Sequence, residues 1–454
     1  MLEQIPFELS KEFIDRFQIA INTRDDAFIK EVLQDVNPAD ITTLLYEFNT
    51  EESKYVIDLL SLETRADIIN DLDADIRKNF LKVFTNEEII DIIDVLDSDD
   101  AVDILNELST RVREEVLAGL DDEEWKSQII DLLRYDPDVA GGLMAKEILK
   151  ANVNWTVVQC IAEIRKQAEN VEKVYSVYVV DDKEILLGRV SLKRIIISDD
   201  NTRIADIYDK DVLAVQTYDS DREVAEIMRK YDLESIPVVN VQGQLLGRIT
   251  IDDIVDVITE QAEEDRQIMA GISESVEEDD SVWRISRARL PWLIIGIMGG
   301  LISARFIGIF ESDLLRVTAI AFFIPLIQAT GGNVGIQSSS IVVQSLVSPG
   351  MRDESMWNRL MKVFVVALVN GFILSLLVFA FNLLLGGDLN LSIVVSVALF
   401  SVVVIASFIG TLTPLILNHF GFNPALASGP FITTTNDLLG LAIYFFTIHF
   451  MLWS

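Results

Sequence analysis

Five apolar stretches in the last third of the chain constrain its fold more than any other feature. Each is long enough to cross a bilayer, which takes about 20 apolar residues in a helix. An odd number of spans puts the two ends of the chain on opposite sides of the membrane. The sequence therefore predicts an α-helical transmembrane domain with five spans, at 290–310, 314–346, 361–386, 391–417 and 429–452.

The charges are divided unevenly along the chain. Residues 1–286 contain 66 acidic and 30 basic side chains, a net charge of −36, whereas the remainder carries +1. Such an acidic part repels nucleic-acid phosphates and anionic lipid surfaces, so we expect no nucleic-acid partner. The single cysteine, Cys160, cannot form an intrachain disulfide and fits a reducing compartment. The beginning of the sequence shows no signal-peptide pattern.

Basic residues beside the spans predict the orientation. They precede the first span or separate the second from the third: Arg284, Arg287, Arg289, Arg352, Arg359 and Lys362. Because cytoplasmic connections are enriched in Lys and Arg, the large N-terminal part is expected in the cytoplasm and the C-terminus outside. We expect a multipass protein of the inner or plasma membrane, surrounded by lipid.

The second span is unusually polar for a membrane helix. Pro325 removes a helix donor, Gly331 and Gly332 weaken a helix, and Asn333 and Gln337 add polar side chains. Irregular backbone at membrane depth is tolerated only inside protein or beside a water-filled cavity. We therefore expect a loop around Asn333 that lines a polar path. The alternative is a kinked helix whose small residues allow close packing.

The fifth span contains a single acidic residue, Asp437. A carboxylate inside a membrane is costly and therefore suggests a functional site. Gly429 and Pro430 are expected to unwind the start of this span. We interpret Asp437 as part of a hydrated cation path, since oxygen ligands favour hard cations such as Mg²⁺ or Ca²⁺. The alternatives are a protonated Asp437 or a structural ion pair with Arg305.

An internal repeat lies in the acidic part. The segment from Val177 to Ile196 aligns without gaps with the segment from Ile236 to Val255, and both contain Leu-Leu-Gly-Arg. Each copy reads as strand, turn, strand and helix, after amphipathic helices over 156–168 and 221–232. The pattern resembles a tandem CBS-domain pair, a module that senses ligands. Two α/β repeats packed for structure alone are the alternative.

The segments on either side of this repeat read as helical. Apolar residues recur three and four positions apart in PADITTLLYEF, ADIINDL, EEIIDIIDVL and DDAVDILNEL, so we expect an all-α superhelical domain. After the repeat, 255–284 is expected to continue as one long acidic helix into the membrane. The predicted domains are 1–135 (helical), 136–262 (CBS pair, divided into 136–205 and 206–262), 263–285 (connecting helix) and 286–454 (transmembrane).

Several acids are grouped where facing carboxylates could share a divalent cation. Such an excess of negative charge destabilises a compact arrangement, and bound cations would relieve it. Sites of one or two carboxylates should bind Mg²⁺ weakly. For most acids a solvated surface is the simpler interpretation. The candidate ligands are Asp99, Asp103, Asp219, Asp221, Asp253, Asp256, Glu264 and Asp265.

This order of domains resembles the MgtE family of Mg²⁺ channels. The segment Pro325–Ser338 is similar to that family's pore motif, and Asn423–Gly440 is similar to its last span. The resemblance implies a homodimer with a central pore that cytosolic Mg²⁺ closes, and all the candidate ligands above except Asp219 as sensor residues. It implies that Asp437 binds the hydrated ion and that Gly331, Asn333 and Gln337 border the path. The chain departs from many relatives at Asn423, where they have Asp near the outer mouth.

The sequence thus predicts a Mg²⁺-selective channel closed by cytoplasmic Mg²⁺. A carrier that couples a divalent cation to Na⁺ or H⁺ is one alternative, and an adenine-nucleotide-sensing membrane regulator is another. ATP at the CBS pair is possible by resemblance, although no residue set decides it. Because the chain contains no GxxxxGK[ST], no HExxH and no convergent nucleophile set, we expect no enzyme. No protein partner is implied beyond a second copy.

Overall fold

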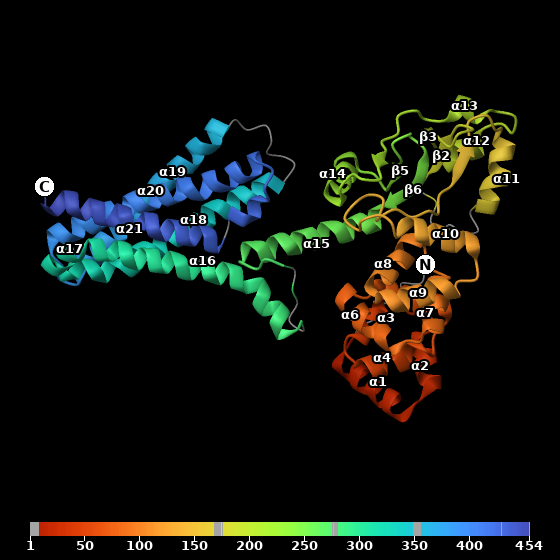
Figure 1. Ribbon diagram of the computed structural model, residues 1–454, viewed down its shortest axis with the longest axis horizontal. Coiled ribbons are helices and arrows are strands. Elements are labelled where there is room, and N and C mark those ends of the chain that lie inside the picture. The colour runs from red at the N-terminus through yellow and green to blue at the C-terminus, as the bar shows by residue number, and fades with distance from the viewer. Residues whose placement is uncertain are drawn as a thin grey trace. The chain divides into compact units, whose positions relative to one another are not determined.

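The structure, a computed structural model, describes residues 9–167, 174, 176–274, 276, 280–347, 356–427 and 429–453 (Figure 1). The chain divides into two compact units, Met1–Ile258 and Thr259–Ser454. Arg352, one of the basic residues in the orientation argument, lies outside the described residues.

Short helices build the N-terminal part of the first unit. Most begin at a side chain that accepts a hydrogen bond from the first turn, and Asn49 with Glu52 and Thr85 with Glu88 form complete capping boxes. The result confirms the predicted all-α domain. The helices are α1 (Lys11–Thr23), α2 (Asp26–Leu33), α3 (Pro38–Leu45), α4 (Thr50–Ile57), α5 (Leu62–Asp71), α6 (Ala74–Phe80), η1 (Leu81–Val83), α7 (Asn86–Ile93), α8 (Ser98–Glu107), α9 (Thr110–Gly119) and α10 (Glu123–Leu132).

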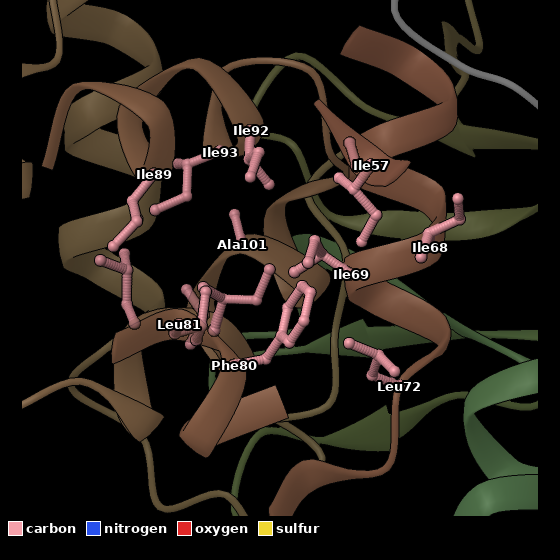
Figure 2. Close-up of a cluster of buried hydrophobic side chains, with 14 of the residues drawn as sticks. Ile57, Ile68, Ile69, Leu72, Phe80, Leu81, Ile89, Ile92, Ile93 and Ala101 are labelled. Atoms are coloured by element: carbon pink, nitrogen blue, oxygen red, sulfur yellow. The ribbon is translucent and has the colours of Figure 1, made fainter. Parts of the chain in front are cut away.

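Successive helices of this part contribute one side chain after another to a shared core. Ile57, Ile69, Phe80, Ile92 and Ala101 come from five helices and lie together in Figure 2. All five are buried. Because each short helix buries one apolar face against its neighbours, the domain gains most of its stability from packing rather than from helix propensity.

The internal repeat folds as two matching three-stranded sheets, which confirms the CBS pair. In each sheet a short parallel strand precedes an antiparallel pair, and the register shifts at Val179/Val180 and again at the equivalent positions of the second copy, Val238/Val239. The strands are β1 (Lys150–Asn152), β2 (Val177–Val180), β3 (Leu186–Val190), β4 (Val215–Gln216), β5 (Ser235–Val239) and β6 (Leu245–Thr250). The helices are α11 (Val157–Gln167), α12 (Leu192–Ile197), α13 (Ile204–Ile207) and α14 (Asp221–Tyr231).

The two CBS domains have different relationships to the N-terminal helices. One continuous apolar cluster extends from those helices into the second CBS domain, where it includes Met228, Ile249 and Ile254. The first CBS domain has a separate cluster with Val179 and Ile195. The N-terminal helices therefore pack on the second CBS domain, and this junction positions the acidic site described below.

The second unit contains five helices that are long and apolar enough to cross a membrane, as expected. The fourth, α20, is the most buried, whereas α16 and α19 expose most of their apolar side chains, as helices facing lipid do. The elements are α15 (Ile251–Met269, which begins in the first unit), α16 (Val282–Ile309), α17 (Glu311–Arg316), η3 (Thr318–Phe323), α18 (Ile324–Val347), α19 (Met356–Leu384), α20 (Leu389–His419), η5 (Pro424–Ala427) and α21 (Pro430–Trp453).

The prediction of one continuous helix over 255–284 is wrong. The helix α15 ends at Met269, and the chain turns at Gly271, whose φ of 82° lies in the left-handed region that glycine adopts readily. A new helix, α16, begins at Val282 with Ser281 as its cap. Among the described residues of the predicted connecting segment 263–285, one helix therefore ends at Met269 and the next begins at Val282.

The prediction of a loop around Asn333 is also wrong. The segment folds as one continuous helix, α18, and Pro325 lies in its first turn, where a missing N–H is tolerated. Gly331, Gly332 and Gly335 all face neighbouring helices. The glycines here serve close packing, which is the alternative interpretation of this span. The break expected at the start of the fifth span is present, since Gly429 has a φ of 59° and α21 begins at Pro430.

Candidate functional site

Two helices bring Asp437 beside the glycines of α18. A Cβ atom built on Gly332 would lie 3.4 Å from Oδ1 of Asp437 and 3.2 Å from Cγ2 of Thr433. The hydroxyl of Tyr444 donates to the carbonyl of Ile320 at 2.8 Å and holds α21 against the segment that leads into α18. The half-buried Asp437 has no hydrogen bond or ion pair within the described part of the chain, and none joins it to Arg305.

Another face of α18, which adjoins the position of Gly332, is exposed in the isolated chain and contains polar side chains. Pro325, Ala329, Asn333 and Gln337 follow one another at four-residue spacing and are all exposed. Residues four apart lie on the same face of a helix. The structure therefore places the candidate path residues Pro325, Asn333 and Gln337 on one stripe, whereas Gly331 and Gly332 lie in the packed interface.

A buried asparagine was missed from the sequence. Asn436 is only 1% exposed, and neither its Oδ1 nor its Nδ2 has a hydrogen-bond partner among the described residues. Its Nδ2 lies against Gly335, where any side chain would collide with it. Gly410 of α20 packs on the carbonyl of Gly335 in the same way. An unpaired buried amide costs free energy. The close packing of the three helices at this junction keeps Asn436 buried in spite of that cost.

A second group of acids lies at the junction of the N-terminal helices and the second CBS domain. Carboxylate oxygens of Asp97, Asp99 and Glu147 all lie within 4.8 Å of one another. Ser98 fixes Glu147 through a hydrogen bond from its hydroxyl to Oε2 at 2.8 Å, and the same hydroxyl accepts from the Lys146 amide. The arrangement gives three convergent oxygen ligands.

Burial and mutual repulsion make these acids hard to ionise together. Burial raises the pKa of Asp253 to about 6, although Thr250 donates two hydrogen bonds to its carboxylate. Burial raises the pKa of Asp100 to about 7, with the charges of Asp253 and Asp97 as further causes. The pKa of Asp99 is raised by burial and by the charges of Asp100 and Asp253. Asp97, Asp100 and Glu147 are not among the ligands predicted from the sequence.

Two further predicted ligands, Asp103 and Asp256, interact electrostatically with Arg77. Burial raises the pKa of Asp256, with help from Asp252, while the Arg77 guanidinium lowers it. Arg77 is itself engaged, because it donates to Glu107 at 2.6 Å and 2.9 Å and to the Asn70 carbonyl. Asp103 is exposed on α8, and its charge contributes to the raised pKa of Asp100.

The other predicted sensor residues lie elsewhere. Asp219 accepts a hydrogen bond from the Gln216 amide at 2.7 Å just before α14, and Asp221 is the first residue of that helix. Glu264 is exposed on α15 in the second unit. Asp265, on the same helix, accepts a hydrogen bond from Asn423. Asn423 therefore lies at the end of the membrane unit that α15 reaches, so its expected position near the outer mouth is wrong.

A small cleft of about 190 Å³ lies in the CBS pair. It is lined by residues of both repeats, including Tyr178, Arg189, Asp211 and Ser235. The hydroxyls of Tyr178 and Ser235 are hydrogen-bonded at 3.0 Å. Pockets for drug-sized ligands usually have about 300 Å³ or more, so this cleft as it stands fits a ring rather than a whole nucleotide.

Comparison with known proteins agrees with this architecture. A family model described as "Divalent cation transporter" matches residues 324–447, the "MgtE intracellular N domain" matches 36–138 and the "CBS domain" matches 204–260. The first covers the helices that hold Asp437 and the glycines. The match to the intracellular N domain indicates that the N-terminal helical domain is cytosolic.

Curated relatives and solved structures extend these matches. The magnesium transporter MgtE of Thermus thermophilus is 34% identical over 94% of this chain and 96% of its own length, and that of Enterococcus faecalis is 35% identical over 71% of each. A crystal structure of the cytosolic domain of the Mg²⁺ channel MgtE with ATP covers 53% of this chain and 98% of its own chain, at 32% identity and a TM-score of 0.50. Because the similarity extends over nearly the whole length of a full relative, the chain belongs to the MgtE family of magnesium transporters.

Proposed function

We infer that this protein is a Mg²⁺-selective channel that cytoplasmic Mg²⁺ closes. Membership of a family of magnesium transporters supports the cargo, and the five candidate spans support a route through the membrane. The observation that most directly supports a pore is the polar stripe of α18, exposed on a helix that is long enough to cross the membrane. No catalytic activity is part of this proposal.

The polar stripe needs an environment other than lipid. Asn333 and Gln337 have no hydrogen-bond partner among the described residues. Polar groups facing hydrocarbon cost several kcal/mol each, so such groups face protein or water. A second copy of the chain with its α18 opposite this one would enclose a water-filled path between the two stripes. The exposed polar side chains of α18 therefore support the homodimer that the resemblance implies.

Asp437 suits a hydrated ion better than a dehydrated one. Mg²⁺ holds its waters tightly and usually keeps several of them in proteins. A carboxylate without protein partners can accept hydrogen bonds from those waters, while its charge attracts the cation. Gly332, beside Asp437, leaves room that a side chain would fill. Asn333 and Gln337 can then hydrogen-bond to the hydration shell along the path.

The acidic junction supports closure by the same ion. Two oxygens on opposite sides of a Mg²⁺ ion lie about 4.2 Å apart when its bonds are about 2.1 Å. The oxygens of Asp97, Asp99 and Glu147 lie within 4.8 Å of one another, so they fit one ion with small adjustments. Bound Mg²⁺ would neutralise the repulsion that raises the pKa values of Asp99, Asp100 and Asp253. It would thereby favour the packed junction over a separated one, which is a shift of population.

The basic residues next to the first span support the orientation of the chain in the membrane. Arg284, Arg287 and Arg289 are in the first turns of α16, next to the cytosolic part of the chain. With five spans, the C-terminus at the end of α21 lies on the outer side of the cell membrane. The sensor then faces the compartment whose Mg²⁺ level it reports.

A nucleotide at the CBS pair is a second, regulatory role that one observation favours. The cleft beside Tyr178 and Arg189 offers aromatic and cationic contacts, and the similar cytosolic domain was crystallised with ATP. We propose that an adenine ring enters this cleft and that the nucleotide adjusts the response to Mg²⁺. Calorimetric titration of the purified full-length protein with ATP and AMP, with Tyr178→Ala as the binding-deficient variant, tests this role separately.

Flux into liposomes tests the channel and its gate together. Purified protein should pass Mg²⁺ down its gradient, and raising Mg²⁺ on the cytoplasmic side should stop it. The double variant Asp99→Asn and Asp253→Asn should stay open at Mg²⁺ levels that close the wild type, while Asp200→Asn, an exposed acid of the first CBS domain, should behave as wild type. Flux that vanishes when Na⁺ and H⁺ gradients are collapsed would instead indicate a coupled carrier.

A further inference from the structure

A large pocket lies at the base of the membrane unit, apart from the polar stripe. Its volume is about 840 Å³, within the range of about 300–1,000 Å³ that is usual for ligand pockets. Its walls come from the turn after α15, the first half of α16 and the first residue of α21. The lining includes Gly271, Arg289, Trp292, Leu293, Gly296 and Pro430. Among the described residues that line the pocket, Arg289 is the only charged one.

The arginines at the start of α16 differ in their partners. Arg284 forms an ion pair with Asp280 at 2.7 Å, and Arg287 forms one with Glu274 at 3.4 Å. Arg289, which lines the pocket, is exposed and has no acidic partner in the described part of the chain. An anionic ligand would match this charge.

The depth of the pocket matches the boundary between head groups and acyl chains. Arg289 and Trp292 lie where the apolar span of α16 begins, and Arg and Trp are typical of that boundary. Beyond them, Leu293 and Ile297 line the pocket and are more than half exposed. One end of the pocket is therefore cationic and the rest is apolar, in the order in which a phospholipid presents its phosphate and its chains.

We propose that this pocket binds an anionic phospholipid of the surrounding leaflet. The head-group phosphate accepts hydrogen bonds from Arg289, and an acyl chain lies along Leu293, Gly296 and Ile297. The negative charge of the cytosolic part works against general adhesion to anionic membranes, so the attraction is confined to this site. The lipid would also contact both Gly271 and Pro430, which already touch: a Cβ on Gly271 would lie 2.6 Å from Cγ of Pro430. It would therefore strengthen the packing of the α15 turn against the start of α21.

Glycines of α16 allow a matched test by filling the pocket. A Cβ on Gly296 would meet no atom within 4 Å, so Gly296→Leu introduces a side chain into the pocket at a position that has open space. Gly300, one turn later, is equally open but does not line the pocket, and Gly300→Leu is the control. For the charge, Arg289→Gln removes the pocket cation, and Arg287→Gln removes a neighbouring cation outside it.

The experiment measures lipid binding to the purified full-length protein in detergent. Native mass spectrometry counts retained phosphatidylglycerol against phosphatidylcholine of the same chain length, and thermal unfolding is followed with each lipid added. We expect selective retention of phosphatidylglycerol and a higher midpoint in its presence. Since one basic residue contributes about 1 kcal/mol to attraction by anionic lipid, Arg289→Gln should weaken binding about fivefold. Gly296→Leu should abolish it, while Gly300→Leu and Arg287→Gln should retain it.

Three results would overturn the proposal. The first is equal retention of the two lipids by the wild type. The second is wild-type retention of phosphatidylglycerol by both Arg289→Gln and Gly296→Leu. The third is a disulfide between two copies of a Gly296→Cys variant in a Cys160→Ser background, because it would show that a second chain covers the pocket. The readout is lipid binding and stability, so it is independent of whether the protein conducts Mg²⁺.

Discussion

Asn423, in the connection between α20 and α21, donates a hydrogen bond from Nδ2 to Oδ1 of Asp265 on α15 at 2.8 Å. The contact joins the helix that arrives from the CBS pair to the segment that leads into α21. A few residues further on, Gly429 packs against the carbonyl of Met269 so closely that no side chain fits between them. Movement of α15 can therefore reach the helix that contains Asp437 through direct contact.

Breaking this hydrogen bond should uncouple the cytosolic sensor from ion flow. We expect Asp265→Ala to reduce, about tenfold, the ratio of flux at low cytoplasmic Mg²⁺ to flux at high Mg²⁺, since a hydrogen bond to a charged group contributes about 1.5 kcal/mol or more. Asn423→Ala should have a similar effect. Liposome flux of both single variants and of the double variant measures it. Effects that simply add in the double variant would mean that the two residues act separately.

Removing the charge of Asp437 should stop conduction without unfolding the protein. Asp437→Asn keeps the size of the side chain but loses the attraction for the cation, so we expect Mg²⁺ flux to fall by more than about tenfold. The matched control is Asp388→Asn, which removes the charge of another membrane-domain acid at the cap of α20, where Asn also caps well. Wild-type flux through Asp437→Asn in the same liposome assay would contradict the path assignment.

A methyl group on Gly335 should destabilise the membrane unit. It would collide with Asn436 and lie 2.8 Å from Cγ2 of Ile432, and overpacking of this kind costs about 1–3 kcal/mol. We expect Gly335→Ala to lower the unfolding midpoint in detergent by several degrees. Gly300→Ala, in open space on α16, should leave the midpoint unchanged or raise it slightly. Equal midpoints for the two variants would show that the helices separate easily at Gly335.

The acidic junction should make the cytosolic unit sensitive to pH. Burial and repulsion raise the pKa of Asp253 to about 6 and that of Asp100 to about 7, so the folded state binds these protons more tightly than the unfolded state does. Without Mg²⁺, stability should therefore fall as pH rises from about 4 to about 7. Because Mg²⁺ competes with the protons, its stabilising effect should be larger at pH 8 than at pH 5.5.

Thermal unfolding at both pH values, with and without Mg²⁺, measures this effect. The double variant Asp100→Asn and Asp253→Asn is the control, since it removes the two titrating groups. It should show a flatter pH profile and a smaller Mg²⁺ effect than the wild type. An identical profile in the variant would place the pH sensitivity in other acids.

The elements of the fold could be predicted from the sequence because each has a local signal. The apolar runs, the helical periodicity and the gap-free internal repeat are all visible in short stretches of the chain. The acidic junction depends on contacts between distant parts of the sequence: Asp99 belongs to an N-terminal helix and Asp253 to the end of the second CBS domain, while Glu147 lies in a connecting segment with no pattern of its own. Asp99 and Asp253 are among the ligands predicted from the sequence, whereas Asp97, Asp100 and Glu147 are not, because only the fold brings these acids together.

The error at Asn333 has a different physical origin. Glycine weakens an isolated helix, but inside a membrane bundle it also lets helices approach closely. Gly331, Gly332 and Gly335 do so against α20 and α21, and this tertiary packing outweighs their low propensity. The sequence alone does not say whether a glycine-rich span has close neighbours. Asn436 was missed for the same reason, since its burial is visible only once α18 is in place.

The burial of α20 has a consequence for biosynthesis. The ribosome delivers α18 to the membrane before α20, against which Gly331 and Gly335 pack. Until α20 is made, α18 lacks this packing partner, and it is less apolar than α19 or α20. Stable insertion of α18 therefore has to await helices encoded downstream, so truncated chains that end before α20 should be recognised by membrane quality control as unfinished.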